Sequence, residues 1–128
     1  MSRSIRSAKQ AGTRFERKVA DYLACSFGDS NIDRQIKTGS KDVGDVRGVY
    51  RNGHKVTIEC KDCSRMELAK WIGEAEVEAG NAGSPFPVVV HKRKGVGSMS
   101  EQYVTMTLET FASILAGGPD LIERGKDE

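Results

Sequence analysis

Residues 43–61 read VGDVRGVYRNGHKVTIECK, and this stretch decides the fold. The dipeptide Asn52-Gly53 near its centre is the strongest short-range signal for a tight turn between two antiparallel strands. We therefore predict a hairpin, with a first strand from Val43 to Tyr50 and a second from Lys55 to Cys60. Residues 51–54 form the turn between them.

The hairpin brings two acidic residues close together. Asp45 lies seven residues before Asn52 and Glu59 lies six residues after Gly53, a spacing compatible with near pairing of the two acids. Aspartate is uncommon in strands, so its presence at position 45 requires an explanation. A divalent cation that bridges Asp45 and Glu59 would supply one. The backbone carbonyl of Cys60 offers a third oxygen ligand.

Side chains on the second strand alternate between two faces. Glu59 and Lys61 therefore point the same way, which places an ammonium group beside a carboxylate. A Glu-x-Lys pair is also common on exposed strand faces, so it is a weak signal by itself. The apolar, inward set is Val56, Ile58 and Cys60, and the opposite face carries Thr57, Glu59 and Lys61.

Helical spacing of apolar residues predicts two helices on either side of the hairpin. The first covers about Thr13 to Ser26 and the second about Met66 to Ala79, and glycines follow both. Between the first helix and the hairpin, the polar loop has room for a short strand around Ile36.

The last part of the chain continues with two strands and a helix. The β-branched run Val88 to His91 predicts a buried strand, and Gln102 to Leu108 alternates as a further one. The order α-β-β-α-β-β-α implies an α/β fold with a mixed central β-sheet flanked by helices. In the closing amphipathic helix we expect the inward residues to be Leu108, Phe111, Ala112 and Leu115.

Length and composition suit one compact domain. The 128 residues are 38% hydrophobic and 30% charged. We expect a basic N-terminal arm over residues 1–12, a single domain over 13–116 and a frayed polar tail over 117–128. No apolar run approaches a membrane span and the polar, basic N-terminus is unlike a secretory signal, so we expect a soluble cytoplasmic protein without a membrane partner.

Three cysteines do not make a disulfide framework. Cys60 and Cys63 form one C-x-x-C pair, which alone is a weak signal for zinc or redox chemistry. We interpret Cys60 as a small buried strand residue and Cys63 as part of the following loop.

Positive charge is concentrated in two segments, although the net charge is only +2. Basic clusters flanked by flexible residues suit contacts with DNA phosphates, and the alternative is a solvated basic surface. The candidate DNA-binding residues are Arg3, Arg6, Lys9 and Arg14 in the first segment, and Lys92, Arg93 and Lys94 in the second.

Glu16 stands out because it falls within the apolar stripe of the first helix, near Val19 and Leu23. An unpaired carboxylate there is costly, so a metal ion or a basic partner at the sheet would explain it. The alternative is a capping box formed by Thr13 and Glu16, which requires the helix to start at Thr13.

These residues together resemble the PD-(D/E)XK nuclease signature: Gly44-Asp45 is followed fourteen residues later by Glu59-Cys60-Lys61. The helix segment GTRFER, residues 12–17, is similar to the first helix of archaeal and phage Holliday junction resolvases. The resemblance covers roughly residues 10 to 115. In this sequence Gly44 stands where the superfamily's name has proline, and either Thr38 or Ser40 matches the family's loop hydroxyl.

The resemblance implies metal-dependent hydrolysis of phosphodiester bonds in branched DNA. Asp45, Glu59, Glu16 and the Cys60 carbonyl would hold Mg²⁺, for which Mn²⁺ would substitute, and Lys61 would act beside it. A homodimer would place two active sites on a four-way junction. The alternatives are another nuclease of the superfamily, a non-catalytic nucleic-acid-binding module, or a small interaction domain in which Glu-x-Lys arises by chance.

Overall fold

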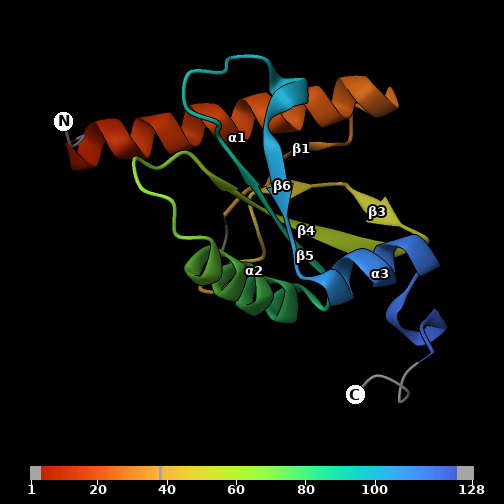
Figure 1. The fold of residues 1–128 in the computed structure, drawn as a ribbon. Helices are drawn as coiled ribbons and strands as arrows, with labels where there is room; N and C mark the ends of the chain where they lie inside the picture. Colours follow the sequence, from red (N-terminus) through yellow and green to blue (C-terminus); the bar gives the residue numbers. More distant parts are fainter. Residues whose placement is uncertain (1–3, 38, 124–128) are drawn as a thin grey trace.

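A computed structural model describes residues 4–37 and 39–123 (Figure 1). Four strands follow the first helix and two follow the second, broadly in the predicted order. The fold also contains two short 3₁₀ turns, Met99–Glu101 and Pro119–Leu121. The elements are α1 (Ile5–Phe27), β1 (Asp33–Arg34), β2 (Val46–Arg47), β3 (Tyr50–Arg51), β4 (His54–Lys61), α2 (Leu68–Ala82), β5 (Phe86–His91), β6 (Tyr103–Thr105) and α3 (Leu108–Ala116).

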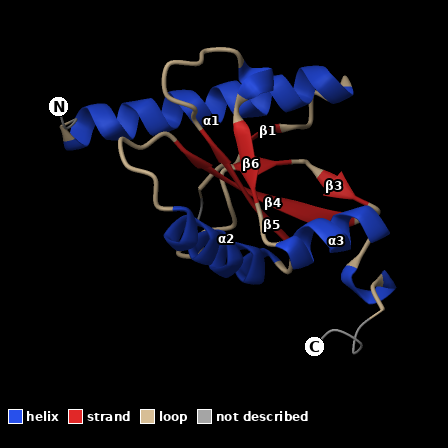
Figure 2. Ribbon diagram, in the orientation of Figure 1, coloured by secondary structure: helices blue, strands red, loops and turns tan. Residues whose placement is uncertain are grey.

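The sheet is mixed and open, which confirms the predicted α/β class. Its order is β1-β2-β4-β5-β6, and β3 pairs with β4 beside this path. β4 and β5 are parallel over six residue pairs, and α2 connects them, whereas the other pairs are antiparallel. In Figure 2 the two longest strands cross the middle of the molecule between α1 and α2.

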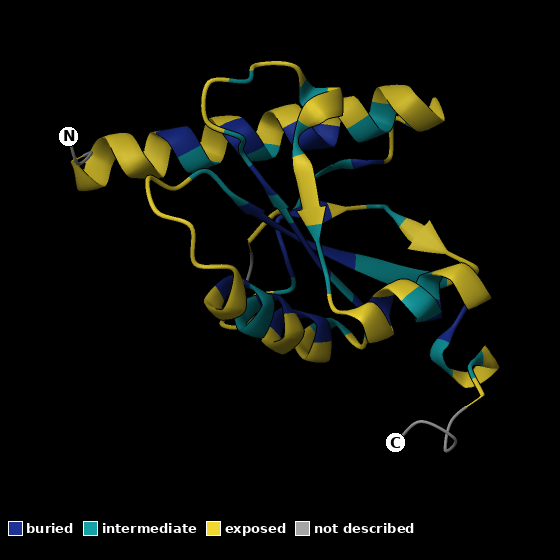
Figure 3. Cartoon of the chain, in the orientation of Figure 1, coloured by how far each residue is buried: buried dark blue, intermediate teal, exposed yellow. Residues whose placement is uncertain are grey.

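Helices cover both faces of the central strands (Figure 3). Ile58 and Cys60 pack toward α1, as the alternation predicted, in a core that includes Phe15 and Val19. On the other face, Trp71 and Ala75 of α2 pack with Val89. The face carrying Thr57 and Glu59 is therefore also buried. Glu59 consequently lies between the sheet and a helix.

The predicted hairpin turn is confirmed, but its first strand is not continuous. Tyr50 pairs with Lys55, and Asn52 and Gly53 have the positive φ angles, 52° and 80°, of a tight hairpin turn. Upstream, Gly48 has φ 88°, and an added Cβ would lie 2.6 Å from the carbonyl oxygen of Asn31. This close passage splits the predicted strand Val43 to Tyr50 into β2 and β3.

The first helix begins eight residues earlier than Thr13. Ser4 is its N-cap and accepts a hydrogen bond from the Ser7 backbone N–H at 3.1 Å. Thr13 lies inside the helix and donates to the Lys9 carbonyl, so the proposed capping box with Glu16 is wrong. The predicted boundary after residue 12 falls within α1, because residues 5–12 are already helical.

Other predicted bounds shift by a few residues. α2 runs from Leu68 to Ala82 rather than from Met66 to Ala79, since the chain turns at Gly83 with φ 65°. β5 begins at Phe86 rather than Val88, and β6 holds only residues 103–105. The short strand expected around Ile36 lies at residues 33–34.

The orientation predicted for α3 is wrong. Leu108 is 80% exposed and Phe111 and Leu115 are exposed too, whereas Thr110 and Ser113 are buried. The rotation of the helix about its axis differs from the prediction, because the tip of the β3–β4 hairpin binds the C-terminal end of the helix. Arg51 donates to the Ile114 carbonyl and Asn52 to the Gly117 carbonyl.

Residues 119–121 form a 3₁₀ turn, so the expectation of a frayed tail is wrong for this part of it, and residues 124–128 lie outside the described residues. Within the described part of the chain, no helix is both long and apolar enough to cross a membrane.

Candidate functional site

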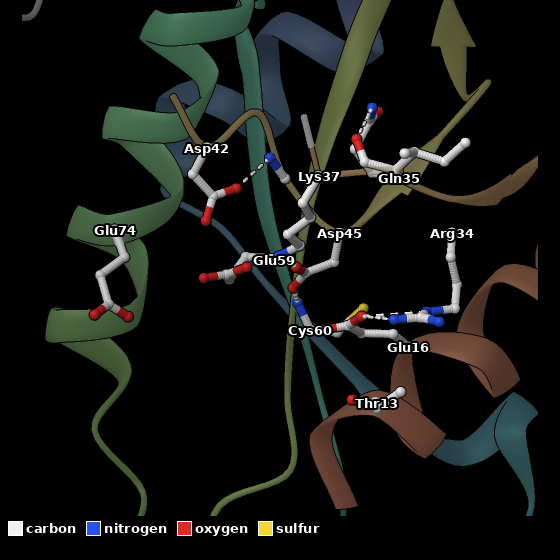
Figure 4. Close-up of polar contacts among 12 residues, drawn as sticks. Thr13, Glu16, Arg34, Gln35, Lys37, Asp42, Asp45, Glu59, Cys60 and Glu74 are labelled. Carbon is white, nitrogen blue, oxygen red and sulfur yellow. Dashed lines mark hydrogen bonds and ion pairs between the residues drawn. The ribbon is translucent and has the colours of Figure 1, made fainter. Parts of the chain in front are cut away.

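Asp45 lies immediately before β2, where the backbone passes close to β4. The Asp45 N–H donates to the Ile58 carbonyl at 2.8 Å, and its Oδ2 accepts the Cys60 N–H at 2.8 Å (Figure 4). Gly44 has φ 100°, and an added Cβ would lie 3.1 Å from the Thr57 side chain. A glycine before the acid therefore lets Asp45 approach the neighbouring strand.

The Asp45 carboxylate is buried and charged. Lys37 Nζ lies 2.7 Å from its Oδ1. Burial alone would raise the pKa of Asp45, but its hydrogen bonds with Glu59, the Cys60 N–H and Lys37 hold that pKa below the usual range. Burial would lower the pKa of Lys37, but Asp45 raises it instead, so this pair stays ionised.

Glu59 joins Asp45 to a third acid, Glu78. The carboxyl group of Glu59 lies within hydrogen-bonding reach of both, and all three side chains are buried. Two carboxyl groups can hydrogen-bond only if one keeps a proton. Burial, followed by the bond to and charge of Asp45, raises the pKa of Glu59 to about 11. Without a cation, Glu59 therefore holds a proton at neutral pH.

Lys61 points to the same face as Glu59, as the strand alternation predicted. Its Nζ lies 3.6 Å from Glu59 Oε2 and 2.8 Å from Glu74 Oε1. Burial would lower the pKa of Lys61, but the bond to Glu74 and the charge of Glu74 raise it. The ammonium is thus fixed beside the acids in its charged form.

Glu16 reaches the same region from α1, and Figure 4 shows it near Cys60 with Arg34 beside it. Arg34 donates to Glu16 Oε1 at 3.2 Å, which supplies the basic partner expected for a carboxylate in an apolar stripe. Burial and the charge of Asp45 raise the pKa of Glu16, and Arg34 partly offsets them.

Two residues at this centre were not identified from the sequence. Glu78 is not among the predicted site residues, although Trp71, Ala75, Glu78 and Ala79 are the buried residues of α2. The helical-stripe argument that identified Glu16 would also have found Glu78. Lys37 had no sequence signal, because it reaches Asp45 from an irregular loop.

The donor set suits a hard divalent cation, although it is not a preformed metal site. Within residues 4–37 and 39–123, no three His, Cys, Asp or Glu side chains are gathered as a metal-binding group. Glu78 Oε1 is nevertheless buried without a hydrogen-bond partner, beside two further carboxyl groups. The Cys60 carbonyl shares the strand edge of its N–H, which faces Asp45. Oxygen donors of these kinds are those that Mg²⁺ prefers.

The remaining predicted residues surround this centre at different places. Arg6, Lys9 and Arg14 are exposed on α1, while Arg3 and Thr38 lie outside the described residues. Ser40 is exposed and lines a 610 Å³ cavity formed by residues 35–37 and 39–44, which include Lys37. The second basic segment, Lys92, Arg93 and Lys94, follows β5.

The cysteines are placed as the sequence indicated. Cys60 is buried in the core next to α1, and Cys63 is exposed in the loop beyond β4. Burial, followed by the charges of the nearby acids, raises the pKa of the Cys60 thiol, which suits a packing role.

Comparison of the chain with protein-family models, curated proteins and solved structures finds no match.

Proposed function

We infer that this protein is a Mg²⁺-dependent DNA endonuclease that resembles the PD-(D/E)XK Holliday junction resolvases and cuts branched DNA. The single observation that carries the proposal is the buried contact between Asp45 and Glu59, with Lys61 on the same strand face. Mutually contacting carboxyl groups in a protein interior are costly unless a proton or a cation is shared. A cation bridging them would allow both to ionise.

In this proposal Asp45, Glu59, Glu16 and the Cys60 carbonyl hold Mg²⁺, and Mn²⁺ substitutes for it. The bound ion would polarise the scissile phosphate and lower the pKa of a coordinated water. Glu16 would have to exchange its bond with Arg34 for this role.

Lys61 acts as the positioned cation. Glu74 holds its ammonium group in place, so the charge is fixed before the substrate binds. A fixed ammonium beside the scissile phosphate orients the attacking water and stabilises the negative charge that develops in the transition state. Glu74 is thus a positioning residue for Lys61.

Basic side chains outside this centre would hold the DNA without reading its bases. On α1 these are Arg6, Lys9 and Arg14, with Arg3 before them, and after β5 they are Lys92, Arg93 and Lys94. All the described members except Lys92 and Arg93 are exposed, and those two are half-buried.

A homodimer would allow paired cuts on opposite strands, because its two-fold axis matches that of a four-way junction. Its interface would be the exposed apolar side of α3, formed by Leu108, Phe111 and Leu115. These side chains lie on one side of the helix and would bury apolar area against a second copy.

The test is cleavage of a synthetic four-way junction and a linear duplex of matched sequence, each with Mg²⁺ and with EDTA. We expect paired, Mg²⁺-dependent cuts in the junction alone, and their loss in Lys61→Ala. Equal cutting of the duplex would indicate a general nuclease of the same superfamily. Tight DNA binding that is unaffected by EDTA and leads to no cut would leave a non-catalytic binding module.

A further inference from the structure

A second cavity lies where the parallel strands β4 and β5 end. It has a volume of 370 Å³ and is bounded by the loop after β4, the basic segment after β5 and Tyr103 of β6. The Lys92 N–H donates to the Lys61 carbonyl at 2.9 Å, so the basic segment starts directly beside the end of β4. In open α/β sheets, ligands commonly bind outside the carboxyl ends of parallel strands.

Three consecutive cations line this cavity: Lys92, Arg93 and Lys94. Lys92 Nζ donates to the Arg93 carbonyl at 2.7 Å, and Lys94 Nζ lies 3.5 Å from the Ser64 carbonyl. Neutral carbonyl oxygens orient these groups without cancelling their charge. An acidic residue, Asp62, lies near these cations, because it lines an adjoining cavity together with Lys92 and Lys94. Among the described residues that line these two cavities, three are cationic and one is acidic, which leaves a net positive charge.

A cation–π contact and an edge-to-face ring contact connect the walls of the cavity. The Arg93 guanidinium lies 4.4 Å from the centre of the Tyr103 ring, and its NH1 donates to the Glu101 carbonyl. His91 is buried, with Nε2 2.7 Å from Thr105 Oγ1. Its Nδ1 has no hydrogen-bond partner among the described residues. Buried nitrogens without partners are uncommon, and His91 lines this cavity, where a ligand could supply the missing partner.

We propose that this cavity binds a phosphate group of the nucleic-acid strand, next to the phosphate that is cut. His91 lies opposite Lys61 in the parallel register, so the cavity adjoins the strand that carries the catalytic lysine. Neighbouring phosphates of one strand could then occupy the two places. The inference rests on the proposed nuclease function for its meaning, but its test does not require cleavage.

The chain contains a probe for this cavity. Trp71 is the only tryptophan, and its ring lies 5.8 Å from that of His91. The full-length protein is titrated in EDTA with thymidine, thymidine 5′-monophosphate and the dinucleotide TpT, while Trp71 fluorescence is recorded. We expect a saturable change with a phosphate-bearing ligand and none with thymidine. A response to the monophosphate alone identifies a terminal phosphate, and a response to TpT identifies an internal one.

The same titration with Lys94→Ala tests which charge binds the ligand. We expect affinity to fall about tenfold, as for loss of one charged hydrogen bond. Lys18→Ala is the matched control, since it removes one charge from an exposed position on α1 and should bind normally. Ser64→Glu, which adds a negative charge inside the cavity, should abolish binding. An equal loss in Lys18→Ala would overturn the inference.

The inference also fails if neither phosphate ligand changes the fluorescence or shows heat of binding by calorimetry, or if thymidine binds equally well. Cleavage by a protein that shows no such binding would leave the proposed function intact and remove only this site. Phosphate binding by a protein that never cuts DNA would leave this site intact and remove the proposed nuclease function.

Discussion

At the scale of single residues, the space between β4 and α2 is governed by three carboxyl groups. Asp45 stays ionised because Lys37 and the Cys60 N–H hold it, and its charge then acts on Glu59. Burial is the main cause that raises the pKa of Glu78, to about 7. The centre therefore carries protons that a divalent cation would replace, which links metal binding to pH.

The metal-free protein should lose stability as pH rises. Glu59 and Glu78 have folded-state pKa values near 11 and 7, above the ordinary 4.5, so the folded chain binds more protons between those limits. The unfolding free energy then decreases as the pH rises above about 4.5, and the contribution of Glu78 is lost as the pH rises through its folded-state pKa of about 7. In Glu78→Gln, the decrease in unfolding free energy between pH 5 and 7 should be smaller than in the wild type by about 2 kcal/mol. Urea unfolding in EDTA at several pH values measures this.

Saturating Mg²⁺ should oppose the same loss, because a cation can replace the protons. The control is Glu76→Gln, which alters an exposed acid on the same helix. A Glu78→Gln protein with the wild-type pH profile would show that Glu78 does not share the protons of this centre.

Lys37 provides a second residue-scale prediction. Lys37→Met removes the ammonium group that lies 2.7 Å from Asp45, so the buried carboxylate loses a charged partner. We expect a loss of about 1–2 kcal/mol in metal-free unfolding free energy at pH 7. Lys41→Met, in the same loop and exposed, is the control. Mg²⁺ should stabilise Lys37→Met more than it stabilises the wild type. An equal gain in both would contradict the hypothesis that Mg²⁺ and the Lys37 ammonium group bind the same place beside Asp45.

At the scale of elements, close backbone passages position the site more than strand propensity does. β2 has only two residues, yet Asp45 is fixed because Gly44 and Gly48 on either side adopt conformations with positive φ. The Gly48 passage against Asn31 also ties the loop after α1 to the sheet. Glycine is required at such positions because a Cβ would both strain the backbone and collide.

Two glycine substitutions separate these effects. Gly48→Ala should cost about 3 kcal/mol, from positive φ and from a Cβ placed 2.6 Å from the Asn31 carbonyl oxygen. Gly53→Ala also has positive φ, but nothing lies within 4 Å of its Cβ, so its cost should be about 1 kcal/mol. Chemical denaturation of both variants gives the comparison. Equal costs would mean that the close approach to Asn31 is relieved elsewhere.

At the scale of the whole molecule, helices on both sides leave the central strands buried (Figure 3). On α3, the apolar side chains of Leu108, Phe111 and Leu115 are exposed. The hairpin tip holds the helix end through Arg51 and Asn52, which fixes that orientation. An exposed apolar surface of this kind is typical of an interface.

A charged double variant tests the dimer. Leu108→Lys with Leu115→Lys should shift the protein from dimer to monomer in size-exclusion chromatography with light scattering, with unfolding free energy of the monomer changed by less than about 1 kcal/mol. Val77→Lys, on the exposed side of α2, should stay dimeric. A wild-type protein that is monomeric at all concentrations would rule out this interface.

Local sequence determined the turn, the strand alternation and the class of fold. Asn52-Gly53 specifies its turn through backbone preference alone, and alternation along β4 puts Glu59 and Lys61 on one face whatever surrounds them. These are short-range effects, so the sequence contains them directly. The same holds for Glu16, whose position in an apolar stripe required a partner.

Only the tertiary structure decided what those faces meet. Glu78 joins Asp45 and Glu59 because α2 packs over the sheet, and Lys37 joins them from the loop before β2. The Glu59–Glu78 contact joins residues far apart in sequence. The exposed side of α3 was likewise set by the distant hairpin tip, against its own apolar pattern. Burial and long-range charge thus fixed the protonation of the site, because these depend on packing that no local pattern encodes.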